Sequence, residues 1–364
     1  MLTRYTTSKN GRPVKQAEIY TQKEHGIGSS QLDADAVKVI LRLQNAGYEA
    51  YIVGGAVRDM LLQKIPKDFD IATSAKPSRI RKLFRNSRII GKRFRLAHIL
   101  FHGGKIIEVS TFRSDQNNAF GSIEDDVHRR DFSVNALYYD PVRRQLLDFV
   151  HGLKDLRKGR LRAVIPLNTI FVEDSVRIIR AVKYMVKANL KADFLLSQRI
   201  KRQSCLLEQA SSSRITEEIY KILGSGYAMS TFALLFSFTS MNYILPGLYK
   251  PLKRNEKGEG QFLDDLARLD SISEKISDRS DLLYYLIRNF FMNLAPWSQN
   301  DRLHFPDVVF DLKKTLQPMI PANKDIETAV AVLLHERGQE HVHRMSRSSR
   351  RRRKRRKKHA PQSR

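Results

Sequence analysis

Two aspartates separated by one residue, Asp68 and Asp70, are the side chains of this sequence best suited to hold a metal ion. On a strand, residues two apart point to the same face, so the two carboxylates project together while Phe69 and Ile71 pack on the opposite face. Paired carboxylates repel each other unless a cation neutralises them, and Mg²⁺ commonly takes one or two carboxylates plus substrate phosphates. Alone, the pair could be a solvated sheet edge. Beside a phosphate site it predicts metal-assisted in-line displacement.

A glycine pair, Gly54 and Gly55, lies upstream of the aspartates and is followed directly by a helical pattern. Free backbone N–H groups at the positive end of a helix suit the oxygens of a triphosphate. Arg58, one turn into the helix, can add a bidentate phosphate contact. The glycines could also form a plain tight turn. Their position before a carboxylate-bearing strand favours a nucleotide site, although the chain contains no P-loop motif.

The elements that position these residues follow an α/β order. Asp33 is placed to cap a helix that Gly47 ends, and His102 to Gly104 form a hairpin turn. Alternating strands and helices of this kind predict a mixed sheet covered by helices. The expected helices are 35–45, 56–63 and 77–86, and the expected strands are 48–53, 69–72, 94–101 and 105–112.

The second half of the chain is expected to be all-α. From about Val172, helix-length segments follow one another at 172–189, 193–208, 213–224 and 228–238. An uncharged stretch, 226–248, is long enough to span a bilayer. Because it contains several serines, threonines and an asparagine, we expect buried helices and no membrane insertion.

The charge of the chain predicts a polyanionic partner. The formal net charge is +27, and residues 341–364 hold twelve Lys and Arg without any Asp or Glu, so the rest of the chain still carries +15. Nucleic acid is the first candidate and an anionic membrane surface the second. The last residues, 344–364, are low in complexity and predicted to be disordered. The residues of this tail predicted to bind RNA are Arg350, Arg351, Arg352, Arg353, Lys354, Arg355, Arg356, Lys357 and Lys358.

The single cysteine, Cys205, excludes a disulfide framework and a cysteine-based zinc site within the chain. The N-terminal residues have no apolar core of a secretory signal. A cytoplasmic location is therefore expected.

A further pair of polar residues, Asp174 and Arg177, is expected on one face of the helix 172–189. Together they offer an acceptor and several donors in a fixed plane, which can pair with the Watson–Crick edge of a base. The alternative is a surface ion pair between Glu173 and Arg177, worth only ~0.3–0.5 kcal/mol.

Four motifs in order carry a family resemblance: GGAVRD at 54–59, DFD at 68–70, RRDFSVNA at 129–136 and EDSVRIIR at 173–180. Over roughly residues 35–250 the chain resembles the class II tRNA nucleotidyltransferase/poly(A) polymerase family. The resemblance implies an α+β architecture. A β-polymerase-type head with a mixed sheet and helices is followed by an all-α neck and body and the basic tail. The expected parts are an extension at 1–33, the head at 34–170, the neck at 171–250, an RNA-binding body at 251–343 and the tail at 344–364.

The resemblance also implies roles for single residues. It places Mg²⁺ at Asp68 and Asp70 and adds Asp131 to the catalytic set. From the residues alone, Glu108 is the other candidate for a third carboxylate, because it lies on a strand of the same sheet. The nucleotide contacts that the family implies are Gly54, Gly55, Arg58, Arg130, Asp174, Arg177 and Arg180.

Three functions remain open at this point. The segments 89–98, 121–126 and 137–139 and the basic tail resemble bacterial poly(A) polymerases. They favour a polynucleotide adenylyltransferase that adds AMP from ATP to RNA 3′ ends without a template. A CCA-adding tRNA nucleotidyltransferase shares the four motifs. A non-catalytic RNA-binding protein on the same fold is the third, and the intact Asp68, Asp70 and Arg58 speak against it.

Overall fold

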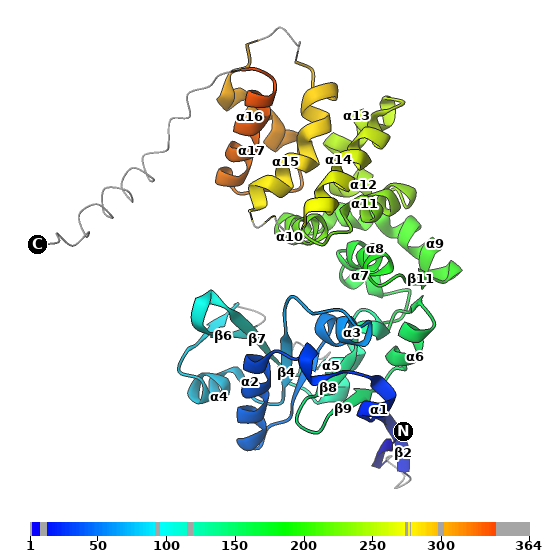
Figure 1. Ribbon diagram of the computed structural model, residues 1–364. Helices are drawn as coiled ribbons and strands as arrows, with labels where there is room; N and C mark the ends of the chain where they lie inside the picture. The colour runs from blue at the N-terminus through cyan, green and yellow to red at the C-terminus, as the bar shows by residue number, and fades with distance from the viewer. Residues whose placement is uncertain are drawn as a thin grey trace, which may run out of the picture. The chain divides into compact units, whose positions relative to one another are not determined.

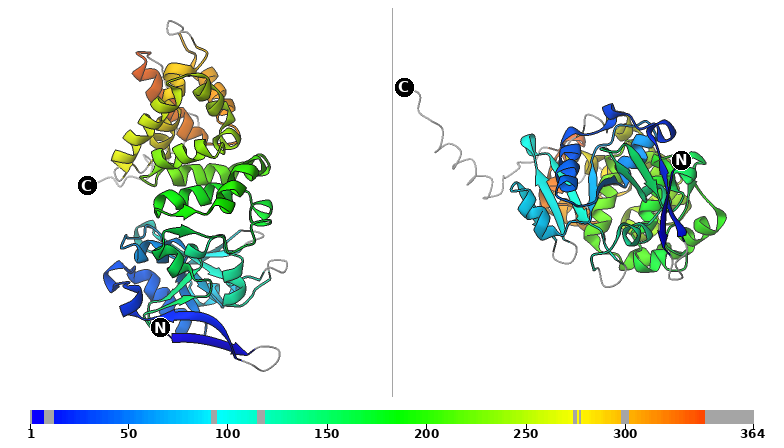
Figure 2. Two further views of the ribbon diagram at one scale, coloured as in Figure 1. Left: turned by 90° about the vertical axis from the view of Figure 1, so that its right-hand side faces the viewer. Right: turned by 90° about the horizontal axis from the view of Figure 1, so that it is seen from below.

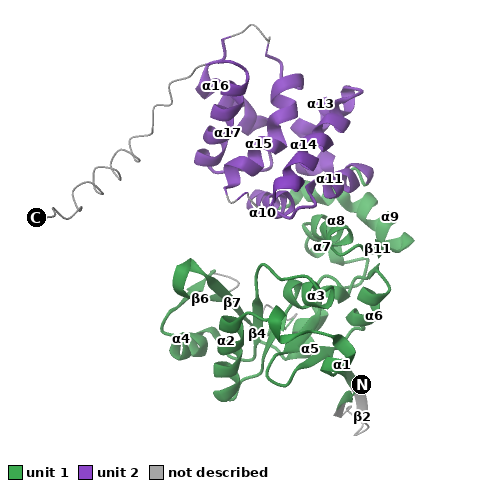
Figure 3. Cartoon of the chain, in the orientation of Figure 1, with its two compact units in different colours: residues 1–210, 238–240 green, residues 211–237, 241–364 purple. Residues whose placement is uncertain are grey.

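The structure, a computed structural model, describes residues 2–7, 13–91, 95–114, 119–273, 276, 278–297 and 302–339 (Figure 1). The tail residues predicted to bind RNA, 350–358, lie outside these ranges, as do 92–94 of the segment 89–98. The chain divides into two compact units (Figure 3). The first unit comprises residues 1–210 and 238–240, and the second unit comprises residues 211–237 and 241–364.

A nine-stranded sheet forms the centre of the first unit, in the order β1-β2-β9-β8-β3-β4-β7-β6-β5. Only the pair β4–β7 is parallel among the strand pairs that the structure describes in this sheet, so the predicted mixed sheet is confirmed. The strands are β1 (Leu2–Thr7), β2 (Pro13–Tyr20), β3 (Ala50–Val53), β4 (Asp70–Thr73), β5 (Ser87–Ile90), β6 (Leu96–Leu100), β7 (Ile106–Thr111), β8 (Leu137–Asp140) and β9 (Gln145–Asp148).

The N-terminal residues form regular structure that sequence patterns did not predict. The sequence predicts only an extension at 1–33, yet β1 and β2 form a hairpin (Figure 2), and β2 pairs with β9 through Glu18–Tyr20. A short helix, α1 (Gln22–His25), follows. Its buried His25 accepts a hydrogen bond at Nδ1 from the backbone N–H of Ile27 over 3.0 Å and faces the carbonyl of Arg144 through Nε2. The hairpin therefore extends the sheet of the head.

The two faces of the sheet carry separate apolar cores. Ile52, Ile71 and Val109 are paired in register and pack with the buried sides of helices α2, α3 and α4. A second core lies on the other face, where the rings of Tyr51, Phe112 and Tyr138 meet with centroids 6.1–6.4 Å apart, Tyr51 stacked on Phe112 and Tyr138 edge-on to both. Each such ring pair contributes ~0.5–1.5 kcal/mol beyond its buried area. The helices of this region are α2 (Ala34–Asn45), α3 (Gly55–Leu61), α4 (Pro77–Leu83), α5 (Ile123–His128) and α6 (Gly152–Arg157).

Local sequence rules account for the bounds of α2. The Asp33 carboxylate accepts hydrogen bonds from the N–H groups of Asp35 and Ala36, which confirms the predicted cap. Gly47 adopts the left-handed conformation (φ +84°) soon after the helix ends. Residues 102–104 form a single 3₁₀ turn between β6 and β7, as the expected hairpin requires.

The predicted helix 172–189 is wrong in one respect, because it is broken. Helix α7 (Ile170–Glu173) ends before Asp174, which is extended (φ −154°, ψ 94°), and α8 (Arg177–Lys187) begins three residues later. The Asp174 carboxylate accepts the N–H of Val176 over 3.2 Å. Aspartate side chains can accept hydrogen bonds from nearby backbone N–H groups in place of the helical carbonyl groups. At Asp174 this side-chain bond replaces the helical one, and the helix is interrupted there. The unit ends with α9 (Phe194–Gln203) and a 3₁₀ turn at Ser204–Gln209.

The regular elements in the described residues of the second unit are helices, as expected. The half of the chain after Val172 was expected to be all-α, but a short strand of the first unit, β11 (Lys191–Ala192), pairs in parallel with β10 (Arg160–Leu161). The segment 226–248, of which 238–240 group with the first unit, forms short helices with buried residues such as Phe232 and Leu235. None of the described helices has the length and apolarity needed to cross a bilayer. The Arg288 side chain joins three helices of the second unit by ion pairs to Asp265 and Glu336. The helices are α10 (Ser212–Leu223), α11 (Ala228–Ser237), α12 (Met241–Ile244), α13 (Pro246–Arg254), α14 (Gly258–Ile272), α15 (Arg279–Asn289) with a π-turn at Phe290–Leu294, α16 (Phe305–Thr315) and α17 (Asn323–Glu336).

The division between the two compact units falls near residue 210. Helix α8 groups with the head because two of its side chains are tied there. Arg180 pairs with Asp131 and Lys187 pairs with Asp59, each over 2.7 Å.

Candidate active site

The two aspartates lie at the beginning of β4 and point away from the helix-covered core. Asp70 is the first residue of the strand, and Asp68 lies two residues before it, outside the strand. Both are exposed, whereas Phe69 and Ile71 are buried. This alternation is the one that the sequence predicts, and it exposes both carboxylates at the beginning of the strand.

A third carboxylate lies in register with them on the neighbouring strand. Glu108 of β7 is the Cα partner of Asp70 across the parallel pair β4–β7, and both side chains are exposed. On the other side of Glu108, the Nε2 atom of His98 lies 3.3 Å from its Oε1 atom. The row His98–Glu108–Asp70 therefore runs across three strands on one face.

The glycine turn stands at the same edge of the sheet. Val53, the last residue of β3, is the Cα partner of Asp70, and Gly54 follows it directly. Gly54 has a backbone conformation (φ +70°, ψ −129°) that favours glycine, and α3 begins at Gly55. The predicted phosphate cradle and the predicted metal ligands thus meet where β3 ends and β4 begins.

Two arginines lie over these glycines. A Cβ atom added to Gly54 would lie 3.6 Å from Nη1 of Arg130, and one added to Gly55 would lie 3.6 Å from Nη2 of Arg58. The structure therefore brings together Gly54, Gly55, Arg58 and Arg130, four of the seven residues predicted to contact the nucleotide. An anion at the turn would meet two guanidinium groups as well as the start of a helix.

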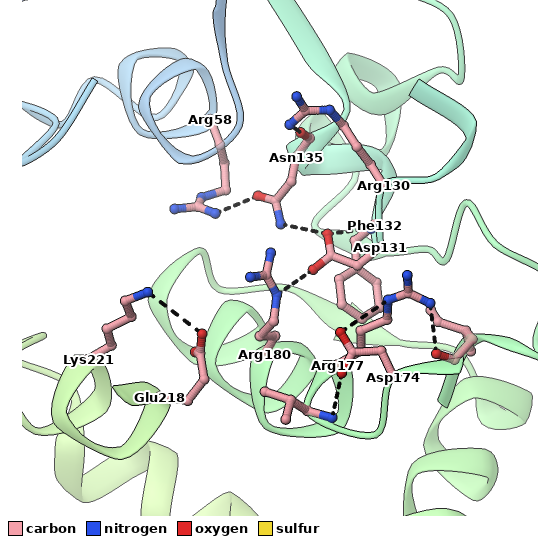
Figure 4. Close-up of polar contacts among 12 residues, drawn as sticks. Arg58, Arg130, Asp131, Phe132, Asn135, Asp174, Arg177, Arg180, Glu218 and Lys221 are labelled. Carbon is pink, nitrogen blue, oxygen red and sulfur yellow. Dashed lines mark hydrogen bonds and ion pairs between the residues drawn. The ribbon is translucent and has the colours of Figure 1, made fainter. Parts of the chain in front are cut away.

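Arg58 is held in a buried, charged clamp. It is only 2% exposed, and its Nε and Nη2 atoms donate to Oδ1 of Asp59 over 3.0 and 2.7 Å. Its Nη1 atom donates to Oδ1 of Asn135 over 2.6 Å (Figure 4). The guanidinium carbon lies 4.9 Å from the centroid of the Tyr184 ring. Lys187 completes the clamp by its ion pair with Asp59.

Arg130 is fixed by a second set of partners. Its Nε atom donates to the Tyr138 hydroxyl over 2.8 Å, its Nη2 atom to Asp126 over 3.0 Å, and its Nη1 atom to the carbonyl of Asn135 over 3.2 Å. Burial alone would lower the Arg130 pKa, but Tyr138 and Asp126 raise it overall, so the guanidinium stays charged.

Asp131 is buried and fully engaged. Its Oδ2 atom pairs with Nε of Arg180 over 2.7 Å, and its Oδ1 atom accepts from the N–H of Phe132 over 2.8 Å (Figure 4). Burial by itself would raise the pKa of this carboxyl, but the charge and hydrogen bond of Arg180 lower it overall. The carboxylate is therefore ionised and anchors Arg180, and both of its oxygen atoms already have partners.

Asp174 and Arg177 lie close together, although on no common helix. The Arg177 Nε atom is 4.0 Å from Oδ2 of Asp174. Its Nη1 atom donates to the carbonyl of Ile170 over 3.0 Å and to Glu173 over 2.9 Å. The ion pair between Glu173 and Arg177 exists, and it fixes the plane of the guanidinium beside Asp174.

The donor set at the start of β4 fits a hard cation. No group of three His, Cys, Asp or Glu side chains converges tightly enough to hold a metal alone, within the ranges that the structure describes. Asp68 and Asp70, with Glu108 beside them, offer carboxylate oxygens and leave other positions to substrate phosphates and water, which is the way Mg²⁺ binds. Sequence reasoning missed the clamp residues Asp59 and Asn135, although both lie within the motifs that it singled out.

The fold and the site define a class of protein: a mixed-sheet head with paired carboxylates beside a glycine-led helix, followed by helices. Residues 50–162 match the family described as the poly A polymerase head domain. Residues 195–250 match the family described as a probable RNA and SrmB-binding site of polymerase A. The chain belongs to the class II tRNA nucleotidyltransferase/poly(A) polymerase family.

The chain is similar in sequence both to poly(A) polymerases and to CCA-adding enzymes. It is 40% identical to poly(A) polymerase I of Escherichia coli O157:H7 over 260 residues, covering 66% of this chain and 56% of that protein. It is 37% identical to poly(A) polymerase I of Haemophilus influenzae over 273 residues, covering 70% and 60%. It is 34% identical to the CCA-adding enzyme of Streptococcus pyogenes serotype M1 over 233 residues, covering 61% and 56%. The chain thus spans little more than half the length of the curated relatives it matches.

Solved structures agree with this fold. A structure titled tRNA-processing enzyme (apo form 2) is 26% identical, with a TM-score of 0.58 over 80% of each chain. The CCA-adding enzyme of Bacillus stearothermophilus in complex with CTP is 24% identical, with a TM-score of 0.52 over 89% of this chain and 98% of that one. The latter likeness bears on the fold alone.

Proposed function

We propose that the protein is a polynucleotide adenylyltransferase that adds AMP from ATP to RNA 3′ ends without a template. The observation that carries nucleotidyl transfer is the meeting of Asp70, Glu108 and the Gly54 turn at one edge of the sheet. The choice of adenylate over the CCA sequence is supported by the greater identity to poly(A) polymerase I, 40% against 34%.

Asp68 and Asp70 would hold Mg²⁺, and we infer that Glu108, not Asp131, is the third carboxylate. Glu108 is exposed and in register with Asp70, whereas Asp131 is buried with both oxygens engaged by other groups. When bound, Mg²⁺ would lower the charge repulsion at the reacting phosphate and make the attacking hydroxyl more acidic. Asp131 instead positions Arg180, which remains among the residues proposed to contact the nucleotide.

The remaining residues bind and orient the two substrates. Arg58, Arg130 and the N–H groups after Gly54 would hold the triphosphate, because they converge on the glycine turn. Asp174 and Arg177 would pair with the base edge. The RNA 3′-hydroxyl is the nucleophile: it forms a bond to the α-phosphorus of ATP, and the bond to pyrophosphate breaks. No covalent intermediate with the protein is required.

A CCA-adding activity is the second candidate, favoured by the Streptococcus pyogenes relative. The test supplies ATP and CTP separately, each with an A-ended RNA and with a tRNA lacking its CCA end. Long A tails on both RNAs support the proposal. Use of CTP confined to the truncated tRNA contradicts it.

A further inference from the structure

A polar cavity in the first unit adjoins the site described above, because Arg177 lines it, but its lining residues Ser114, His128 and Arg129 have no role in that site. Its volume is about 190 Å³, and it is lined by Ser114, His128, Arg129, Glu173 and Arg177, among others. Pockets that enclose whole drug-sized ligands measure ~300–1,000 Å³. The cavity is therefore too small for a nucleotide and large enough for a small charged group with some water.

One wall of the cavity carries an unpaired cationic group. The Nη1 atom of Arg129 is buried and has no hydrogen-bond partner among the residues that the structure describes. Its two neighbours in the motif, Arg130 and Asp131, have their polar atoms engaged. A buried donor on a charged group is costly to leave unpaired, because its water has been removed without replacement. The Nη1 atom of Arg129 therefore lacks a hydrogen-bond acceptor among the described residues.

The charges around Arg129 favour an anion as the missing acceptor. Burial lowers the pKa of Arg113, and the positive charge of Arg129 close by lowers it further. Among the acids nearby, Asp126 is occupied by Arg130 and Tyr138, and Glu173 is paired with Arg177. Arg129 and Arg177 thus line the cavity, and the charge of Arg113 lies close to Arg129, while Asp126 and Glu173 are already engaged.

We propose that this cavity is a phosphate subsite that binds a phosphodiester of the RNA, an inference that rests on the proposed function. The RNA is favoured over the nucleotide because the triphosphate already has a cradle at Gly54, where Arg58 and Arg130 converge.

The test measures binding of an A-ended oligoribonucleotide to the full chain without ATP, by fluorescence anisotropy at several salt concentrations. Replacement of Arg129 by glutamine removes the charge but keeps a polar side chain. Loss of one charge-assisted contact weakens RNA binding about tenfold. It also reduces the magnitude of the slope of log K against log salt by ~0.7, the value for one phosphate contact on a single strand. Arg129→Lys keeps the charge and should keep the slope.

The matched control is Arg79→Gln, an exposed arginine on α4, which should leave RNA affinity and slope unchanged. ATP binding, measured separately by calorimetry, should stay within twofold of the wild type in both variants. Unchanged RNA affinity and slope in Arg129→Gln overturn the proposal. Weaker ATP binding with unchanged RNA binding also overturns it, because the anion then belongs to the nucleotide. A wild-type chain that binds no RNA contradicts the proposed function itself.

A second comparison separates a ligand site from a structural ion pair. The Oε1 atom of Glu124 is also buried without a partner among the described residues, and Glu124 lies on α5 just before Arg129. If Arg129 forms an ion pair with Glu124, Glu124→Gln and Arg129→Gln each lower the melting temperature, and the decrease in the double variant is smaller than the sum of the two. If Arg129 binds an RNA phosphate, Arg129→Gln does not lower the melting temperature of the free protein. Added RNA then raises the melting temperature of the variant less than that of the wild type.

Discussion

Replacement of Asp59 by asparagine removes the charge that neutralises the buried Arg58. Arg58 is 2% and Asp59 is 6% exposed, and they share two hydrogen bonds of 3.0 and 2.7 Å. Removal of one partner of a buried ion pair leaves an uncompensated charge and costs ~3 kcal/mol or more. We therefore expect Asp59→Asn to lower the free energy of unfolding by about 3 kcal/mol. We also expect it to weaken ATP binding about tenfold, because Arg58 is no longer fixed beside Gly55.

The assay combines denaturant unfolding with ATP titration by calorimetry. Asp140→Asn is the control, because Asp140 is buried and paired with Arg143 in the turn between β8 and β9, away from the glycine turn. The control should lose stability and keep the ATP affinity of the wild type. If Asp59→Asn retains full stability, the electrostatic argument is refuted. If it loses stability but binds ATP normally, Arg58 does not contact the nucleotide.

Three further predictions follow from other parts of the chain. Asp70→Ala should abolish nucleotide addition while RNA still binds, and full residual activity would contradict the metal assignment. Deletion of residues 344–364 should weaken RNA binding and flatten its salt dependence, while the addition of a single nucleotide persists; an unchanged salt slope would refute this. Burial lowers the pKa of His25, and its Nδ1 atom must stay unprotonated to accept from Ile27. The folded state therefore binds fewer protons, and stability should fall as the pH drops below ~6.5. His25→Gln should remove that part of the pH dependence, and an unaltered profile would disprove the assignment.

Local patterns of the sequence were enough to predict much of the head. Alternation around Phe69 gives the orientation of Asp68 and Asp70, because neighbouring strand residues always face opposite sides. Asp33 as a cap and Gly47 as a terminator depend only on residues close by. These are short-range effects, so the bounds of α2 and the exposure of the two aspartates could be predicted from nearby residues.

Contacts between distant residues could not be predicted in this way. The pairing of β2 with β9 joins residues more than 120 positions apart, and Arg58 meets Asn135 across 77 positions. Asp131 is paired with Arg180 across 49 positions, so its family resemblance alone did not show that both its oxygens are engaged. The helix break at Asp174 is local, but it arises because the Asp174 carboxylate accepts the N–H of Val176. The spacing of apolar residues does not indicate such a side-chain hydrogen bond.

In the proposed reaction the RNA 3′-hydroxyl attacks the α-phosphorus of ATP. Label transfer tests this step: ATP labelled at the α- or the γ-phosphate is supplied with an A-ended RNA and with the same RNA ending in a 3′-deoxynucleotide. We expect the α-label to enter only the RNA with a free 3′-hydroxyl and the γ-label to leave as pyrophosphate. Transfer of γ-label to RNA, or α-label on the 3′-deoxy RNA, would contradict it.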